Sequence, residues 1–384
     1  MKHKTTLLLA PLAAPALLAF TLPLDPPRSN GAPGAPGAPG ALGALGALGA
    51  TVEKVAFAPK EGTKVKKTFV TSGSFDLEDM SFLMNGEDPG GMPEMEMTTS
   101  WSQTVKVTDE YAAMGEGRPA KLVRTFDELG QEIDLEITVD MGESQDNSNS
   151  GSGSSDLEGE TVVFAWDAEE EDFTKAFAEG SDADEDLLEG LVEDMDLRGL
   201  LPDGPVSEGD SWDIELTSLV HIMAPGGDLG IDVEIEGLEG AGMGGPDPNM
   251  MSNFNEILGD LLEGDATAKF TGTREVDGKR VGVIEVSLDI TAASDLTDLM
   301  EEMMSDEMPE GLEVSFDSMD LDFTFEGTGE LLWNLEGGHV HAFQLSGEVS
   351  MAMEMAFSIT MGEEMDMEVS MEMSGTVSQK VETE

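Results

Sequence analysis

Methionine has the most distinctive spacing of any residue that could do chemistry in this chain. Near the C-terminus it recurs at every second position in two runs separated by Gly362-Glu363-Glu364. Residues spaced by two share one face of a β-strand. The residues concerned are Met351, Met353, Met355, Met361, Met365, Met367, Met371 and Met373.

Three interpretations of this methionine face follow. Alternation alone explains every residue, which favours an ordinary core face. The flexible, polarizable thioether also suits a deformable wall for a lipid or another apolar small molecule. Soft sulfur ligands would, thirdly, suit Cu(I). The candidate ligand-binding set is Met351, Met353, Met355, Met365, Met367, Met371 and Met373.

Acidic and histidine side chains are the next candidates, as metal ligands. Asp182, Asp184, Asp186 and Glu193 match four ligand positions of a calcium-binding loop, but Leu187 stands where that loop needs glycine. His339 and His341 would share one face of a strand, as zinc ligands can. The turn residues before them explain the pair more simply as the start of a strand. We therefore expect no cofactor, with weakly bound Ca²⁺ as the alternative.

No catalytic constellation emerges from the sequence. Ser211 lies in Gly-Asp-Ser-Trp, which lacks the second glycine of a nucleophile elbow. Paired carboxylates could hydrolyse glycosides, but no pair can be singled out among 80 Asp and Glu residues. We therefore predict a protein that is not an enzyme, with a carboxylate-based hydrolase kept as an alternative.

The segment around Ser211 carries a motif that resembles known proteins. Residues 201–212 read Leu-Pro-x-x-Pro-Val-x-x-Gly-Asp-Ser-Trp. This pattern resembles a signature of uncharacterised exported bacterial β proteins. The resemblance implies an N-terminal export signal and repeated strand hairpins. It implies no activity, cofactor or functional residue.

The elements that must position these residues are mostly strands. Apolar and polar residues alternate over 133–141, 284–290 and 321–325, which is typical of strands with one buried face. Asp277-Gly278 predicts a two-residue hairpin turn, and Gly130 and Gly337-Gly338 are placed similarly. The predicted fold is mainly β: a large curved antiparallel sheet of long hairpins with a few packed helices.

The C-terminal methionine runs predict the longest hairpin. Placing Met361 opposite Met365 puts both apolar sets on one face. Each strand then spans about 13 residues, or roughly 44 Å. The same register sets Glu354 opposite Glu372, where two like charges repel each other.

Helices and loops are predicted in fewer places. Residues 186–197 carry an apolar stripe and form the best helix candidate. Residues 249–262 and 296–304 are weaker helix candidates. The Ser/Asn/Gly run at 144–155 is expected to be a disordered loop.

Four regions follow along the chain. Residues 1–24 resemble a signal peptide, with Lys2 and Lys4 before an apolar run; retention as an uncleaved anchor is the alternative. Residues 25–50 form a low-complexity Gly/Ala/Pro/Leu spacer. Residues 51–240 form a first β-rich region with a helical insert, and 241–384 a second that ends in the methionine hairpin.

Composition limits the partners and the location. A net charge of −61 from 19 Lys and Arg against 80 Asp and Glu disfavours nucleic acid and anionic membranes, which attract clustered basic residues. The sequence has no cysteine, so it forms no disulfide and no thiolate site. We predict an exported protein, periplasmic, cell-surface or extracellular, that acts in binding or structure. Its expected partners are an apolar small molecule or lipid and divalent cations, and its oligomeric state is left open.

Overall fold

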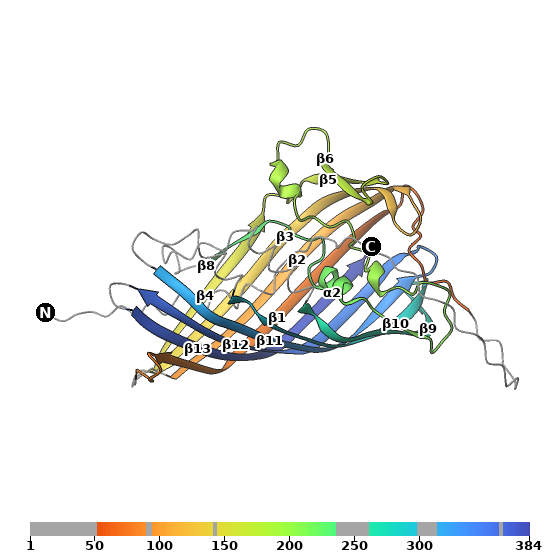
Figure 1. Ribbon diagram of the computed structural model, residues 1–384. Coiled ribbons are helices and arrows are strands. Elements are labelled where there is room, and N and C mark those ends of the chain that lie inside the picture. The colour runs from red at the N-terminus through yellow and green to blue at the C-terminus, as the bar shows by residue number, and fades with distance from the viewer. Residues whose placement is uncertain (1–51, 90–93, 141–143, 236–260, 298–312, 361–363) are drawn as a thin grey trace, which may run out of the picture.

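The computed structural model describes residues 52–89, 94–140, 144–235, 261–297, 313–360 and 364–384. Within them a single antiparallel sheet of thirteen strands dominates the molecule, as Figure 1 shows. The prediction of a mainly β fold with one large antiparallel sheet is confirmed. The described residues contain one α-helix, α2 at Leu216–Met223, and two short 3₁₀ turns, η2 at Glu185–Leu188 and η3 at Arg198–Leu200.

The sheet is open, and its spatial order is β6-β5-β3-β2-β1-β13-β12-β11-β10-β9-β7. Off this path, β4 pairs with β3 and with β8. The strands are β1 Lys64–Met84, β2 Glu94–Met114, β3 Pro119–Asp140, β4 Ser144–Ser155, β5 Thr161–Asp167, β6 Asp172–Phe177, β7 Ser211–Asp213, β8 Ile231–Ile235, β9 Glu263–Val276, β10 Lys279–Asp295, β11 Glu313–Asn334, β12 His339–Thr360 and β13 Glu364–Thr383.

Pairing between β1 and β13 joins the beginning and the end of the described chain. Strands from both predicted β-rich regions therefore belong to one sheet. The expected boundary near residue 240 lies outside the described residues, as do the signal peptide, the spacer and Met361.

The central strands are long, and the sheet twists and curves along them (Figure 1). β11 and β12 each have 22 residues, well beyond the usual strand length of about 3–10. Side chains alternate between a buried inner face and an exposed outer face, as in β10, where Val286, Leu288 and Ile290 are buried and the residues between them are exposed. The inner face carries one continuous hydrophobic core.

Two of the three predicted hairpin turns are confirmed. Asp277 and Gly278 have φ of 52° and 74° and join β9 to β10, as a type I′ turn requires. Gly337-Gly338 connects β11 to β12. The prediction at Gly130 is wrong, because this residue lies inside β3 opposite Thr104.

The methionine hairpin forms with a register two residues away from the predicted one. Ile359, rather than Met361, lies opposite Met365, so Glu354 lies opposite Ser370 and not opposite Glu372. A shift of two residues keeps each side chain on its face. The expected shared apolar face therefore survives, and the expected repulsion between two glutamates does not occur.

The predicted helix at 186–197 is wrong. Only Glu185–Leu188 forms a 3₁₀ turn, and Gly190 follows with φ of 65°. The carbonyl groups of Val192 and Glu193 accept hydrogen bonds from Arg124 instead of from helical amides. Tertiary contacts thus replace the local hydrogen bonds that a helix would need.

The expected loop at 144–155 is a strand. β4 pairs with β3 along its length and with β8 over Gly151–Ser155. β3 pairs with the backbone of β4, and β8 adds pairing on the other side of its last five residues, so a strand forms without apolar side chains. The helix candidates at 249–262 and 296–304 lie almost entirely outside the described residues.

Candidate functional site

The seven predicted methionines lie together on the inner face of β12 and β13. Met351 lies opposite Met373, and Met353 lies opposite Met371. Five of the seven are buried, namely Met351, Met353, Met355, Met371 and Met373. Met365 and Met367, nearer the hairpin turn, are half-buried. We call the seven residues the methionine face.

Burial changes along the strands. At the end where β12 begins, Tyr111, Leu122 and Trp333 are completely buried, with 0 % exposure. Toward the other end, Met351, Met353, Met355 and Met371 keep 5–6 % exposure, and Phe82, Phe316 and Leu321 keep 8 %. The largest side chains at the first end, which we call the closed end, are thus fully buried, and those of the methionine face on β12 are buried with slightly more exposure.

A buried ionic network holds the closed end together. Asp109 on β2 lies between Lys67 on β1 and Arg124 on β3. Lys67 Nζ is 2.8 Å from Asp109 Oδ2, and Arg124 Nε is 2.8 Å from Asp109 Oδ1. All three side chains have 0 % exposure. Three neighbouring strands therefore share one set of charges on the inner face.

Residues 191–198 pack on the inner face of the sheet and complete this network. Lys67 Nζ is also 2.8 Å from Asp196 Oδ1, which accepts a hydrogen bond of 2.7 Å from the Tyr111 hydroxyl. Arg124 donates to the backbone carbonyls of Val192 and Glu193 at 2.9 and 2.8 Å. The network thus ties a loop to the sheet at atoms that water cannot reach.

The charges keep one another ionised. Burial raises the pKa of Asp109, but Arg124 and Lys67 outweigh this effect and hold the pKa at about 2. Burial likewise opposes the charge on Lys67, yet Asp109 and Asp196 raise its pKa. Such groups neither accept nor release a proton near neutral pH. The arrangement is that of a structural latch rather than of a general acid or base.

Glu193 behaves differently at the edge of the latch. It pairs with Arg198, whose Nε is also 3.1 Å from Asp194 Oδ1. Its Oε1 atom is buried without a hydrogen-bond partner. Burial, with the neighbouring Asp194 and Asp196, raises the pKa of Glu193 to about 7 against the opposing effect of Arg198. Sequence reasoning did not find the latch, since its residues are distant in the chain and no spacing connects them.

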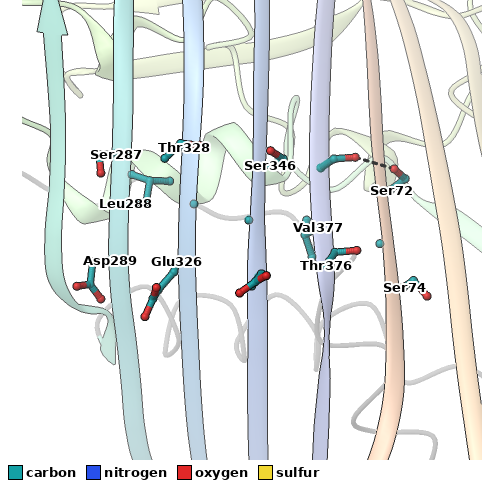
Figure 2. A pocket seen from close by; sticks show the side chains of 15 residues that line it. Ser72, Ser74, Ser287, Leu288, Asp289, Glu326, Thr328, Ser346, Thr376 and Val377 are labelled. Atoms are coloured by element: carbon teal, nitrogen blue, oxygen red, sulfur yellow. Dashed lines mark hydrogen bonds between the residues drawn. The ribbon is translucent and has the colours of Figure 1, made fainter.

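The outer face carries a shallow groove of about 830 Å³ across β10, β11, β12, β13 and β1 (Figure 2). Its lining is mostly Ser, Thr and Gly, with Asp289, Glu326 and Glu348. These three acids are directly opposite one another on neighbouring strands, and Asp265 on β9 extends the row. Figure 2 shows Asp289 and Glu326 side by side. Like charges in this position repel each other.

The other predicted metal ligands each have a separate structural contact. Asp184 caps η2 by accepting from the Asp186 amide at 3.3 Å, whereas Glu193 belongs to the latch. His339 contacts the carbonyl of Val340 and the amide of Asn334, and His341 Nε2 is 3.9 Å from Asp277. Among the described residues, no group of three or more His, Cys, Asp or Glu could hold a metal ion.

The segment 201–212 has a structural explanation for its pattern. Val206 and Glu53 exchange two backbone hydrogen bonds of 2.8 Å, and the Ser207 amide donates to Asp210 Oδ2 at 2.7 Å. Gly209, with φ of 95°, donates its amide to Phe270 on β9. Trp212 then pairs with Ala268 in the short strand β7. The motif docks a turn against the edge of the sheet, and Ser211 is exposed there.

No family model matches this chain, and no curated protein matches its sequence. In the part of the chain that the structure describes, no helix is both long and apolar enough to cross a membrane.

Proposed function

We propose that this protein is a non-enzymatic extracytoplasmic binding protein that holds an apolar ligand against its methionine face. The observation that carries the proposal is the methionine face itself, a continuous set of flexible apolar side chains on two neighbouring strands. A latch of ion pairs fastens the closed end, whereas the methionine face is apolar and built from side chains that change shape readily.

The dimensions of this face suit an extended chain. Val349 to Ile359 on β12 spans ten residue steps, or about 34 Å at 3.4 Å per residue. Val349, Met351, Met353, Met355 and Phe357 are buried along this strip. Binding sites for apolar molecules are lined mainly by such side chains. The signal-like residues 1–24 support the extracytoplasmic location.

Binding can be measured with pyrene-dodecane, an uncharged fluorescent hydrocarbon, and the exported part of the chain. We expect saturable binding to the wild type. Met353→Gln places a polar amide on the methionine face and should weaken binding about tenfold, which corresponds to about 1.4 kcal/mol. Ala352→Gln places the same side chain on the other face of β12 and should leave affinity unchanged.

Thermal unfolding of both variants separates a loss of binding from a loss of folding.

The position of the ligand can be measured by bromine quenching of tryptophan fluorescence, using a dibrominated alkane. Trp101 on the inner face of β2 should be quenched, whereas Trp333 at the closed end should not. Absence of saturable binding, or equal effects of the two glutamine variants, would reject this function and leave a structural role.

A further inference from the structure

Two polar side-chain atoms on the inner face of β2 have no hydrogen-bond partner. They are Thr99 Oγ1 and Trp101 Nε1, and both are buried. The residues are 1 % and 6 % exposed. They lie two apart on one strand, so they face the same side about 7 Å from each other. Buried donors without partners are rare in native proteins.

The residues directly opposite these two offer no acceptor from their side chains. Thr99 lies opposite Phe75 on β1 and Leu135 on β3, and Trp101 lies opposite Gly73 and Ile133. The indole of Trp101 lies over Gly73, where an added Cβ would be 2.7 Å from Nε1. Glycine therefore makes room for the ring beside the apolar wall. A hydroxyl and an indole N–H thus lie without partners among apolar side chains, and the next buried polar side chain on this face of β3 is Gln131.

The charges of the inner face limit what these donors can bind. Among the residues whose burial the structure describes, the buried basic side chains are Lys67 and Arg124. Both belong to the latch and are paired with Asp109. Neither is free to neutralise an anion brought into the core, where an unpaired charge is very costly. The polar group of the ligand should therefore be an uncharged hydrogen-bond acceptor.

We infer that the ligand is a neutral acyl ester, whose ester oxygens accept hydrogen bonds from Thr99 Oγ1 and Trp101 Nε1 while its hydrocarbon chain contacts the methionine face. This inference rests on the proposed function and names its ligand class. The two donors become satisfied only when the ligand is present. A hydrocarbon without an ester would occupy the wall and leave both donors unpaired.

The test uses three probes with the same pyrene-dodecyl chain: the hydrocarbon, the methyl ester of pyrene-dodecanoic acid, and the free carboxylate at pH 8. The protein variants are Thr99→Val, which keeps the shape of threonine without its hydroxyl, and Trp101→Phe, which removes the indole N–H. Ser100→Ala, on the outer face of the same strand, is the matched control.

We expect the double variant Thr99→Val/Trp101→Phe to bind the ester about tenfold more weakly and the hydrocarbon within twofold of wild type. Ser100→Ala should change neither affinity. The carboxylate should bind wild type at least tenfold more weakly than the ester. Thermal unfolding of the double variant shows whether it is folded, and Thr99→Val alone, which is nearly isosteric, should show the same selective loss to a smaller extent.

The outcomes separate the two proposals. If the double variant and Thr99→Val lower the affinity of ester and hydrocarbon equally, or of neither, the ester assignment is wrong and the apolar binding function stands. Tighter binding of the carboxylate than of the ester would also overturn the assignment. If none of the three probes binds wild type, the proposed function fails together with the inference.

Discussion

At the scale of residues, the latch shows how buried charges can specify a position rather than add stability. Removing charges from water costs about as much as their mutual attraction returns, so a buried pair adds little net stability. Removing one partner is different, because it leaves the other charge buried and unpaired. Asp109 is the critical residue, since both Lys67 and Arg124 depend on it.

Asp109→Asn should therefore destabilise the protein by about 3–5 kcal/mol, since Arg124 loses its paired carboxylate in the core and Lys67 keeps only Asp196. Glu110→Gln is the matched control on the next residue of β2. Glu110 pairs with Lys64 at the surface, at 36 % and 64 % exposure, and its loss should cost at most about 1 kcal/mol. Denaturant unfolding measures the free energy of unfolding of both variants. Similar losses in the two variants would contradict this prediction, because they would show that the core tolerates the removal of the Asp109 charge.

Glu193 should make stability depend on pH in the neutral range. Its folded-state pKa of about 7 lies above the ordinary value of 4.5, so the folded protein holds this proton more tightly than the unfolded chain does. The stabilisation is complete below pH 4.5 and is lost as the pH rises through 7. The total should be about 3 kcal/mol.

The variant Glu193→Gln keeps the shape of the protonated acid and should flatten this dependence. Between pH 5 and 8, its free energy of unfolding should fall less than that of the wild type. Glu189→Gln, which replaces an exposed acid nearby, serves as the control and should follow the wild-type curve. A Glu193→Gln curve parallel to the wild type would mean that Glu193 is already ionised at pH 5.

At the scale of elements, the hairpin turns need glycine for two different reasons. Gly278 has φ of 74°, and an added Cβ would have open space around it. Gly338 has φ of 66°, and an added Cβ would be 2.6 Å from the backbone of Ala58. The turn after β11 is thus also a contact for the chain before β1, whose Ala58 amide donates to the Gly338 carbonyl.

Alanine at the two turns should separate conformational cost from collision. Gly278→Ala should cost about 1 kcal/mol, the usual cost of a left-handed conformation for alanine. Gly338→Ala should cost clearly more, because the backbone of Ala58 must also move. Chemical denaturation measures the free energy of unfolding of both variants. Equal losses would show that residues 52–63 move at little cost to make room for the added methyl group.

At the scale of the whole molecule, repulsion between acidic side chains opposes folding. The net charge is −61, and the sheet places acids directly opposite one another on its outer face. Asp265, Asp289, Glu326 and Glu348 form a row over four neighbouring strands. Self-repulsion of this kind destabilises a compact state and is reduced by salt.

Glu326→Gln should therefore raise the thermal midpoint at low salt, through a gain of about 0.2–1 kcal/mol. Glu96→Gln is the control, because Glu96 lies opposite Thr138 rather than opposite an acid. The advantage of Glu326→Gln should disappear at high ionic strength, where the repulsion is screened. A benefit that persists in molar salt would have to come from something other than charge.

The same row offers a test of calcium. Thermal midpoints in NaCl, MgCl₂ and CaCl₂ at matched ionic strength should rise gradually and together if the acids need only screening. A midpoint that rises with micromolar calcium alone and then saturates would show specific binding. That result would indicate a calcium site formed by these carboxylates.

The alternation of apolar and polar residues by itself determined the strands, the shared apolar face of the methionine hairpin and the turn at Asp277-Gly278, because these depend on neighbours in the chain. The strand at 144–155 and the non-helical course of 189–197 depend instead on partners far away: β3 and β8 for the former, Arg124 for the latter. The register of the methionine hairpin was also decided in three dimensions, because a shift of two residues preserves every face and so leaves no trace in the alternation. The latch and the unpaired donors at Thr99 and Trp101 appear only when distant strands meet, since burial alone turns an ordinary polar side chain into one that needs a partner.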